Sequence, residues 1–314
     1  MPPHAGHIAL CRAAEMMCDQ LTILVCWLPD DPIAGELRME WMRQLFPQSR
    51  LIGNGAEVPQ HPDESEEFWP IWREIVQRAH PEPIDLLFAG EEYGDELAKQ
   101  VGGKFVPLGG RIIDADQNGL GGLSGQKIRE DLSAEWTHLP GPVRRDMVKT
   151  VVLHGIESSG KSTLAASLAD ELKSCWVPEY GRSHCVVHGT ELSQSDLSLI
   201  AAAQQAMIAS AKEWSGLILP CDTDWLMTRA WHRMIFDAPL NCPAFPIADL
   251  YLYLAADTEW IDDGLRLFGS NKQRLKFDNL CREELIAAGA NWITINGSWD
   301  ERYEQAIEAV QSLD

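Results

Sequence analysis

The residues with the clearest chemical meaning in this 314-residue chain lie between Gly155 and Thr163 and read Gly-Ile-Glu-Ser-Ser-Gly-Lys-Ser-Thr. The apolar run Val151–Leu153 comes shortly before them, and a helical pattern begins at Lys161. A strand, a glycine-rich loop and a helix N-terminus in this order point backbone N–H groups at a row of phosphates, so we expect the loop to bind ATP or GTP. Lys161 would reach the phosphates, Ser162 would hold Mg²⁺, and the expected ATP-binding residues are Gly155, Glu157, Ser158, Ser159, Gly160, Lys161, Ser162 and Thr163. An ordinary glycine-containing turn is the alternative, which the flanking strand and helix disfavour.

A second candidate phosphate site begins at residue 4, where His4-Ala5-Gly6-His7 leads into an apolar helical pattern. Two histidines at a helix N-terminus can donate hydrogen bonds to one phosphate, and Gly6 between them lets the ligand approach the backbone. Such a site stabilises the charge that develops on an α-phosphate during in-line displacement. An incidental histidine pair near a frayed terminus is the alternative.

The segment Ser124-Gly125-Gln126-Lys127-Ile128-Arg129 begins another short helical pattern. Its hydroxyl and its two cations suit the β- and γ-phosphates of a nucleotide, although a capped and solvated helix start would look the same. This segment and the histidine pair are together far more specific than either is alone. The residues expected to be catalytic are His4, His7, Lys127 and Arg129, and those expected to bind ATP are Gly6 and Ser124.

Acidic residues follow two strand-like runs in the second half of the chain. Glu179 follows Trp176-Val177, and both Asp222 and Asp224 follow Leu217–Cys221. Ligands bind beyond the carboxyl ends of strands in open α/β sheets. Glu179 could accept the proton of a ribose hydroxyl there, and a surface glutamate at a helix start is the alternative. A carboxylate of Asp222 or Asp224 could hold Mg²⁺, and one of the two could instead cap the next helix.

Two arginines near the end of the chain are candidates for contact with a transferring phosphoryl group. Arg266 and Arg274 follow the acidic segment Asp262-Asp263. Closing over the phosphoryl group, they would neutralise its charge as it moves. Exposed arginines on a helix are commonplace, and this is the alternative reading.

Strand-like and helix-like patterns alternate in both halves of the chain, which predicts parallel sheets with helices on both faces. Strands are expected at residues 21–27, 84–89, 104–108, 151–154, 217–221, 250–254 and 292–295. Helices are expected at residues 36–46, 67–78, 94–100, 161–173, 195–214, 223–235, 279–288 and 300–312. Leu139-Pro140-Gly141-Pro142 interrupts both periods. We therefore expect two domains, residues 1–141 and 142–314, with a short connection.

Composition excludes some classes of partner. The formal net charge of −21 argues against a nucleic-acid-binding surface, which needs a basic patch, and against binding to an anionic membrane. No apolar run approaches the ~18 residues of a membrane span. The eight cysteines are scattered without a C-x-x-C pair, which is typical of reduced thiols. We expect a cytoplasmic protein with no DNA and no membrane partner.

In their order along the chain, these motifs resemble those of the NadR-type bifunctional enzymes. That family joins a nicotinamide mononucleotide adenylyltransferase domain to a ribosylnicotinamide kinase domain. The matching segments cover nearly the whole chain and are residues 2–7, 91–94, 124–129, 155–163, 178–182, 222–224 and 260–266, followed by Lys272 and Arg274. The resemblance implies an α/β fold, in which a Rossmann-like nucleotidyltransferase domain precedes a P-loop kinase domain, both with parallel sheets.

The resemblance also implies an activity, the salvage of NAD. The second domain would phosphorylate the 5′-hydroxyl of nicotinamide riboside with ATP and Mg²⁺, and the first would transfer AMP from another ATP to the nicotinamide mononucleotide. The implied catalytic residues of the kinase step are Lys161, Glu179, Asp222, Arg266 and Arg274, and the implied metal ligands are Ser162 and Asp222. The implied substrate-binding residues are Trp69, Trp72, Trp176, Arg182 and Asp224. Trp69 and Trp72 share a helix face, for which core packing is the more common explanation. The expected partners are small molecules, and a homo-oligomer is left open.

The sequence departs from the family pattern at its start. Family members have a strand and a Gly-Xaa-Phe turn before the segment that matches Pro2–His7, where this sequence has Met1. We expect the DNA upstream of Met1 to encode such an apolar strand. Gln126 also stands where a threonine or serine is usual, and a glutamine can still donate to phosphate. Two alternatives remain: a kinase alone with a degenerate N-terminal domain, and a non-catalytic regulator that senses NAD or ATP.

Overall fold

The computed structural model describes residues 2–91, 93–109, 125–257 and 270–313. The chain divides into two compact units, Met1–Val143 and Arg144–Asp314. The boundary falls two residues after the one expected from the Pro-Gly interruption. Instead of a bare linker, that interruption begins a short helix, α6 (Gly141–Met147), with Pro142 in its first turn, where a missing N–H costs no hydrogen bond.

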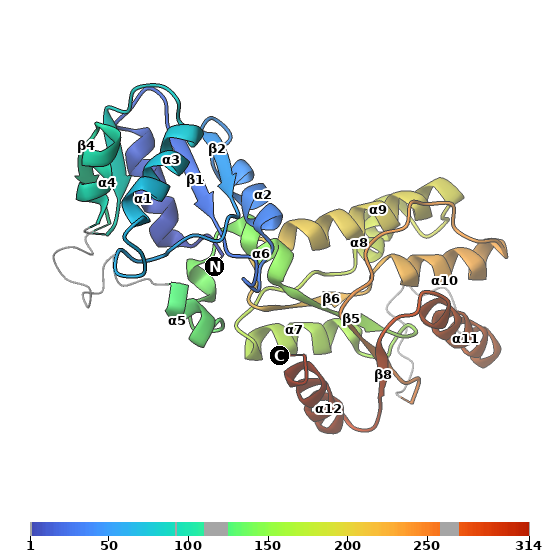
Figure 1. Ribbon diagram of the computed structural model, residues 1–314. Helices are drawn as coiled ribbons and strands as arrows, with labels where there is room; N and C mark the ends of the chain where they lie inside the picture. The colour runs from blue at the N-terminus through green and yellow to red at the C-terminus, as the bar shows by residue number, and fades with distance from the viewer. Residues whose placement is uncertain (1, 92, 110–124, 258–269, 314) are drawn as a thin grey trace. The chain divides into compact units, whose positions relative to one another are not determined.

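The first unit alternates helices with short strands (Figure 1). Its elements are α1 (Ala5–Glu15), β1 (Thr22–Cys26), α2 (Gly35–Leu45), β2 (Arg50–Asn54), α3 (Phe68–Ala79), β3 (Leu86–Ala89), α4 (Gly94–Val101), β4 (Lys104–Pro107), α5 (Gly125–Glu130) and the 3₁₀ helix η2 (Trp136–His138). A small apolar cluster of Cys11, Met42 and Phe46 joins α1 and α2, with side chains of β1 and β2 packed against it. Helices therefore cover the strands, as the alternating pattern predicts.

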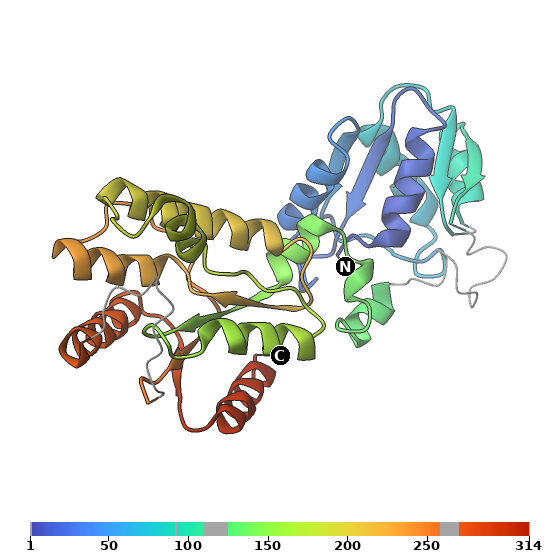
Figure 2. The same ribbon diagram turned by 180° about the vertical axis from the view of Figure 1, so that it is seen from behind.

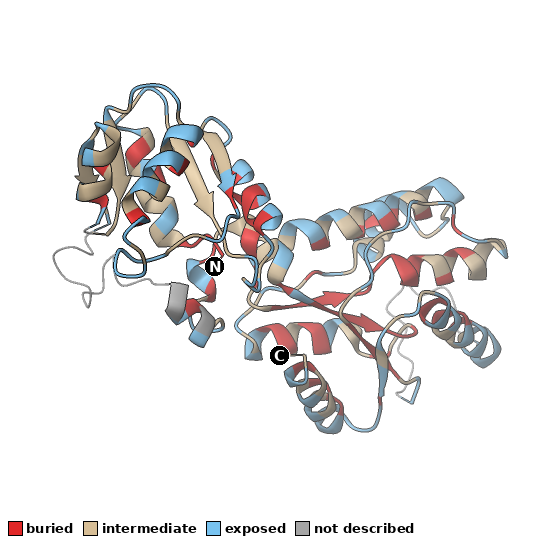
Figure 3. Cartoon of the chain, viewed as in Figure 1, coloured by how far each residue is buried: buried red, intermediate tan, exposed pale blue. Residues whose placement is uncertain are grey.

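The strands of the first unit form two separate parallel pairs. Among the described residues, β1 pairs with β2 and β3 pairs with β4, and no described strand joins the pairs. A cavity of about 960 Å³ is lined by every residue of both β1 and β3. All of these residues are only partly buried, as the tan strands of Figure 3 show. Since parallel strands are normally buried on both faces, the cavity lies where a strand between β1 and β3 would pair with each.

The second unit is a parallel sheet in the order β6-β5-β7-β8. Its elements are β5 (Lys149–His154), α7 (Lys161–Glu171), α8 (Tyr180–His188), α9 (Gln194–Ala211), β6 (Ile218–Asp222), α10 (Trp225–Phe236), β7 (Leu250–Leu254), α11 (Asn271–Ala287), β8 (Trp292–Ile295) and α12 (Trp299–Gln311). Figures 1 and 2 show α7 and α12 on one face of the sheet and α9 and α10 on the other. Strands β6 and β7 are buried along their whole length, and an apolar cluster packs β5 and β7 against α7 and α12. The predicted α/β class with parallel sheets is confirmed.

Most predicted elements are present, and besides α6 three differences have physical reasons. Strand β2 was not predicted, because Arg50-Leu-Ile-Gly-Asn has little apolar character and is fixed by its register with β1. Helix α8 was not predicted, because His184 is its one described buried residue and it shows no apolar period. Helix α11 begins at Asn271, eight residues before the predicted start at 279. Ser270 caps it, because its side chain accepts from the Gln273 N–H.

Among the described helices, none combines the length and the apolar character that crossing a membrane requires.

The cavity between β1 and β3 gives a first testable prediction. A chain extended ahead of Met1 by about five apolar residues ending in Gly-Xaa-Phe should place a strand between them, since strands of this length are usual. Backbone N–H groups of β1 and β3 should then exchange with solvent more slowly, because they gain hydrogen-bond partners. Hydrogen exchange read by mass spectrometry on peptides covering 22–26 and 86–89 measures this. An extension of equal length with two central prolines is the matched control, and equal exchange in both extended chains would refute the idea.

Candidate functional site

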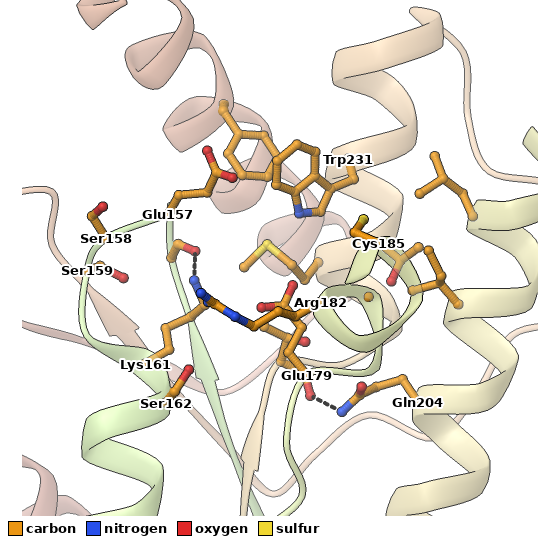
Figure 4. A pocket seen from close by; sticks show the side chains of 18 of the residues that line it. Glu157, Ser158, Ser159, Lys161, Ser162, Glu179, Arg182, Cys185, Gln204 and Trp231 are labelled. Atoms are coloured by element: carbon orange, nitrogen blue, oxygen red, sulfur yellow. Dashed lines mark hydrogen bonds between the residues drawn. The ribbon is translucent and has the colours of Figure 1, made fainter. Parts of the chain in front are cut away.

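The phosphate loop connects β5 to α7 in the second unit (Figure 4). Lys161 Nζ donates to the carbonyl oxygens of Gly155 and Ile156, both at 3.0 Å, so the ammonium is held over the loop. Ser158 and Gly160 have φ values of +64° and +89°, which wrap the backbone around a concave centre. A Cβ on Gly155 would come within 2.6 Å of the Leu254 carbonyl oxygen, so a glycine is required there. All loop residues that the sequence predicts to bind ATP line a cavity of about 310 Å³.

Asp222 stands beside the loop because β6 pairs with β5. The register places Leu153 opposite Asp222 at the carboxyl end of both strands. The Ser162 hydroxyl donates to Asp222 Oδ2, whereas Oδ1 is buried and has no hydrogen-bond partner among the described residues. Burial raises the pKa of Asp222, and the charge of Lys161 and the Ser162 hydrogen bond act against this. A carboxylate oxygen without a partner, beside a hydroxyl oxygen, is a donor set that suits a hard divalent cation.

Glu179 reaches the same cavity from the segment before α8. Val177 pairs with Cys221 of β6, and this bridge carries the chain to the edge of the site. Burial raises the pKa of Glu179 to about 7, and the nearby charge of Asp222 adds to the rise, whereas Lys161 and Arg182 oppose it. Glu179 therefore exchanges protons near neutral pH, which suits a general base.

Gln204 of α9 organises the backbone under Glu179. Its side-chain oxygen accepts from the Tyr180 N–H at 2.7 Å, and its Nε2 donates to the carbonyl of Thr223 at 3.3 Å (Figure 4). Gln204 is 2% exposed, so both contacts are shielded from water. One buried amide thus ties the segment that carries Glu179 to the end of the strand that carries Asp222.

Two aromatic rings form the far side of the cavity, and the sequence did not identify them. Trp231 of α10 and Phe277 of α11 line it, with ring centroids 4.5 Å apart. Their helices are joined by buried Glu284, which pairs with Arg229 Nε at 2.7 Å and with Arg233 Nη1 at 3.0 Å. A signal was present within α10, since Met227, Thr228 and Trp231 share one helix face. The contact with Phe277 depends on tertiary packing.

Two predicted substrate-binding residues lie elsewhere. Asp224 does not line the cavity; it caps α10 through Oδ1, which accepts from the Leu226 N–H at 3.0 Å, and its Oδ2 accepts from the Tyr251 hydroxyl at 2.6 Å. The alternative that one aspartate caps the helix was correct. Trp176 packs against the apolar cluster of β5, β7 and α7 and is also not among the cavity-lining residues. The aromatic side chains that do line the cavity include Trp231 and Phe277.

The remaining candidate residues differ in whether they line the cavity. Arg182 lines the cavity with Glu179. Arg274 lies on α11 one turn before Phe277, outside the set that lines the cavity. Arg266, like Ser124 of the first unit, lies outside the described residues.

The histidine pair of the first unit stands at the N-terminus of α1, as predicted. His4 is buried and is the N-cap, and its Nδ1 accepts from the Gly6 N–H at 3.2 Å. A neutral His4 ring therefore carries its proton on Nε2, where it can donate. The His7 ring lies against it with ring centroids 3.9 Å apart and the ring planes inclined by 35°, and His7 lines the cavity between β1 and β3. Lys127 is exposed on α5, and the side chain of Arg129 lies outside the description.

The tryptophan pair of the first unit is used for packing. Trp69 meets Phe68 edge-on at 4.9 Å, and Trp72 Nε1 donates to the Pro59 carbonyl at 2.9 Å. Neither lines the cavity between β1 and β3. Through this bond Trp72 holds the loop that precedes α3, which agrees with the packing alternative.

Behind the phosphate loop, the last residue of β5 is a histidine with no exposed surface. Both ring nitrogens of His154 lack a hydrogen-bond partner among the described residues, and the ring stacks on Tyr253 with centroids 5.9 Å apart. Burial lowers the pKa of His154 to about 3, and the charge of Lys161 acts in the same direction. The ring is therefore neutral at the base of the loop, where it adds no charge.

Known proteins that resemble this chain cover both of its units. A family model described as an AAA domain matches residues 150–302. The trifunctional NAD biosynthesis/regulator protein NadR of Escherichia coli is 27% identical over 99% of this chain and 81% of its own length. That of Salmonella typhimurium is 26% identical over the same shares. Solved structures of NadR in complex with NR, and with NAD and AMP-PNP, share the fold with TM-scores of 0.68 and 0.67 at 21% and 22% identity, each covering 99% of this chain and 93% of the other. These matches confirm the predicted resemblance.

A second prediction follows from His154. Its pKa in the folded chain lies below the ordinary value of 6.5, so the folded state binds fewer protons than the unfolded state as pH falls from 6.5 towards 3. The stability that neutral His154 contributes is complete above pH 6.5 and is lost on acidification, at up to about 1.4 kcal/mol per pH unit. His154→Phe should therefore flatten the acid limb of the unfolding free energy, measured by urea titration at several pH values. His61→Phe, at an exposed position, is the control, and equal acid limbs in wild type and His154→Phe would contradict the assignment.

Proposed function

We propose that this chain, a NadR-type protein, makes NAD from nicotinamide riboside in two steps that each consume ATP. The second unit phosphorylates the 5′-hydroxyl of the riboside, and the first transfers AMP to the mononucleotide so formed. The observation that carries the proposal is the cavity of the second unit, where a phosphate loop, an ionisable glutamate and an aromatic wall meet. Relatives named as NAD biosynthesis proteins, and a solved NadR in complex with NR, support the choice of substrate.

In the proposed kinase site, the phosphate loop binds ATP through its backbone N–H groups and Lys161. Lys161 acts on the transferring phosphoryl group, whose charge is spread over its oxygens as it moves. Ser162 and Asp222 would hold Mg²⁺, because Asp222 Oδ1 is buried without a described partner beside the Ser162 hydroxyl. The ion, when bound, would neutralise phosphate charge. Positioning and charge neutralisation supply the catalysis, without a covalent intermediate.

Glu179 is the proposed general base. It lines the cavity together with the loop and with Arg182, so a riboside hydroxyl placed between them would lie within its reach. A pKa of about 7 leaves much of the carboxylate ready to accept the hydroxyl proton at neutral pH. Arg182 neutralises charge on the same side of the cavity and binds the substrate.

Trp231 and Phe277 are the proposed contacts of the nicotinamide ring. The ring of nicotinamide riboside is a pyridinium cation, and a cation is attracted to the face of an aromatic ring, most strongly that of tryptophan. The acidic groups of the cavity, Glu157 and Glu179, favour the same positive charge. This arrangement would select the riboside of a cationic base over an ordinary neutral nucleoside.

In the first unit, His4 and His7 are the proposed stabilisers of the α-phosphate during adenylyl transfer. His4 Nε2 is the donor that its tautomer provides, and Gly6 leaves room for the phosphate near the start of α1. Lys127 and Arg129 would neutralise the charge of the pyrophosphate that leaves, and the Ser124 hydroxyl would donate a hydrogen bond to it. Both substrates being small molecules, no DNA or membrane partner is proposed.

A kinase without adenylyltransferase activity is the second candidate, and one observation favours it. The strand pairs β1-β2 and β3-β4 border a cavity of about 960 Å³, which His7 also lines. Phosphate chemistry tolerates little misplacement of its donors, so an unsupported loop would lose rate. Incubation with nicotinamide riboside and ATP separates the candidates: NAD indicates both activities, the mononucleotide alone indicates the kinase, and neither product indicates a sensor.

Lys161→Ala gives the third prediction. Removing the ammonium should lower phosphorylation of nicotinamide riboside by about 10²–10³-fold, because its charge acts mainly on the transferring phosphate. Adenylyl transfer to supplied nicotinamide mononucleotide should be unchanged, since its proposed phosphate contacts lie in the first unit. Both rates are measured by chromatography of the products, with circular dichroism to verify the fold. A parallel fall of both activities in a folded variant would rule out two separate sites.

Glu179 gives the fourth prediction. As a base whose pKa is about 7, it is protonated and inactive at low pH, so kcat/KM for the riboside should rise with pH through about 7 and then level off. Glu179→Gln should lower the rate by about 10²–10³-fold and remove this acid limb. Asp170→Asn, at an exposed acid of α7, should keep the wild-type profile. An unchanged acid limb in Glu179→Gln would assign the proton to another group.

A further inference from the structure

The C-terminal helix α12 brings a buried charge against the phosphate loop. Arg302 is 1% exposed, and its side chain reaches four acceptors. Its Nε donates to the Gly297 carbonyl at 2.9 Å, its Nη1 to the Ser159 carbonyl at 2.8 Å, and its Nη2 to the Ala255 carbonyl at 3.2 Å. Nη2 also pairs with the carboxylate of Asp257. One guanidinium therefore joins the phosphate loop, the segment after β7 and the turn before α12.

Burying this charge has a cost that the contacts must offset. A guanidinium removed from water needs its donors satisfied, and a fixed planar fork can serve several carbonyls only where their positions match. Asp257 supplies the opposite charge, and its other oxygen accepts from the Gly297 N–H at 2.9 Å. Both the guanidinium of Arg302 and the carboxylate of Asp257 therefore have hydrogen-bond partners. None of the members of this network takes part in the proposed phosphoryl transfer itself.

The contact with Ser159 fixes the direction of one peptide group of the phosphate loop. The peptide bond between Ser159 and Gly160 is planar and trans, so its carbonyl and its N–H point to opposite sides. With the carbonyl held by Arg302, the Gly160 N–H is turned the other way, towards the concave side that binds phosphates. Gly160 has no side chain of its own to hold this orientation, and its φ is +89°.

A second contact from α12 supports the same peptide. The ring of Trp299 packs on Gly160 so closely that a Cβ there would lie 2.3 Å from its Cζ3 atom. The Arg302 guanidinium lies 5.5 Å from the centre of that ring. Ser158, two residues earlier, has a φ of +64°, which is uncommon for a residue other than glycine. A loop in this conformation persists where its surroundings hold it, and α12 supplies two such contacts.

We propose that Arg302 is a positioning residue for the phosphate loop, which holds the Ser159–Gly160 peptide so that the Gly160 N–H faces the nucleotide. It touches neither substrate nor reacting atoms, and it acts through the loop. The inference rests on the proposed kinase function for its kinetic consequence, but its effect on nucleotide binding does not depend on which hydroxyl is phosphorylated.

The test compares three variants of the full chain with wild type. Arg302→Met removes all four contacts, Arg302→Lys keeps the charge but not the fork, and Arg282→Ala is the matched control. Arg282 forms an ion pair with Asp278 at 3.0 Å and lies over Tyr253, in the same unit but without a recorded contact to the loop. The measurements are the Kd of ADP by calorimetry, the KM of ATP and of nicotinamide riboside, kcat and the midpoint of thermal unfolding.

Arg302→Met should raise the Kd of ADP and the KM of ATP by about tenfold, which is the loss of one strong hydrogen bond to the phosphates, and leave the KM of the riboside within about twofold. Arg302→Lys should give an intermediate rise, and Arg282→Ala should lower thermal stability without changing the Kd of ADP. If Arg302→Met does not fold, Asp257→Asn, which removes the opposite charge and leaves three contacts, should raise the Kd by about two- to threefold.

If the folded Arg302 variants bind ADP as tightly as wild type, the proposal is overturned and Arg302 is a purely structural residue. If these variants do not fold, wild-type ADP affinity in Asp257→Asn has the same meaning. A rise in both KM values together would overturn the proposal as well, because a general loosening of the cavity would then explain the loss. A wild-type chain that binds ADP but does not phosphorylate the riboside would refute the proposed function alone, since ADP affinity still decides the role of Arg302.

Discussion

The parallel pairing of β5 with β6 is the interaction on which the candidate site depends. It sets Leu153 opposite Asp222, two residues before the loop begins at Gly155, and so brings the Asp222 carboxylate to the Ser162 hydroxyl. Successive side chains of a strand point to opposite faces, so a shift of the register by one residue would turn Asp222 away from the loop. The Thr223 N–H donates to the Leu153 carbonyl at 3.2 Å and extends the pairing past the strand end. The position of the proposed metal ligand is thus a consequence of sheet register.

The charges around the loop explain why the site is poised for a ligand. Glu157, Glu179, Lys161 and Arg182 line the cavity, and Asp222 accepts from the Ser162 hydroxyl beside it. Burial raises the pKa values of both Asp222 and Glu179, and the nearby charges of Asp222 and Glu157 raise the pKa of Glu179 further. This repulsion between carboxylates destabilises the site when no ligand is bound. A bound cation would relieve it. Sites that must bind and transfer charge commonly carry such a cost.

The sequence was sufficient for features that depend on neighbouring residues. The phosphate loop, the strand before it and the helix after it form one contiguous pattern, and the histidine pair at the start of α1 is equally local. Asp222 could be placed because it ends an apolar strand. Contacts between distant segments could not be predicted: Phe277 meets Trp231 where α10 packs on α11, and buried Glu284 joins these two helices. Trp176 was assigned to substrate for its closeness in sequence to Glu179, but alternation along the chain turns it to the apolar core.

The two units differ in what fixes their proposed phosphate-binding groups. In the second unit, Asp222 and the loop follow β6 and β5 of one sheet, in which β6 and β7 are buried throughout, and Arg302 of the last helix holds the loop. In the first, the described contacts of His4 include local ones, the bond from the Gly6 N–H and the ring contact with His7. The strands nearest to that pair, β1 and β3, are only partly buried and border a common cavity. Since in-line displacement depends on fixed donors, the geometry of the second site is set by its own sheet. That of the first site depends on what pairs with β1 and β3.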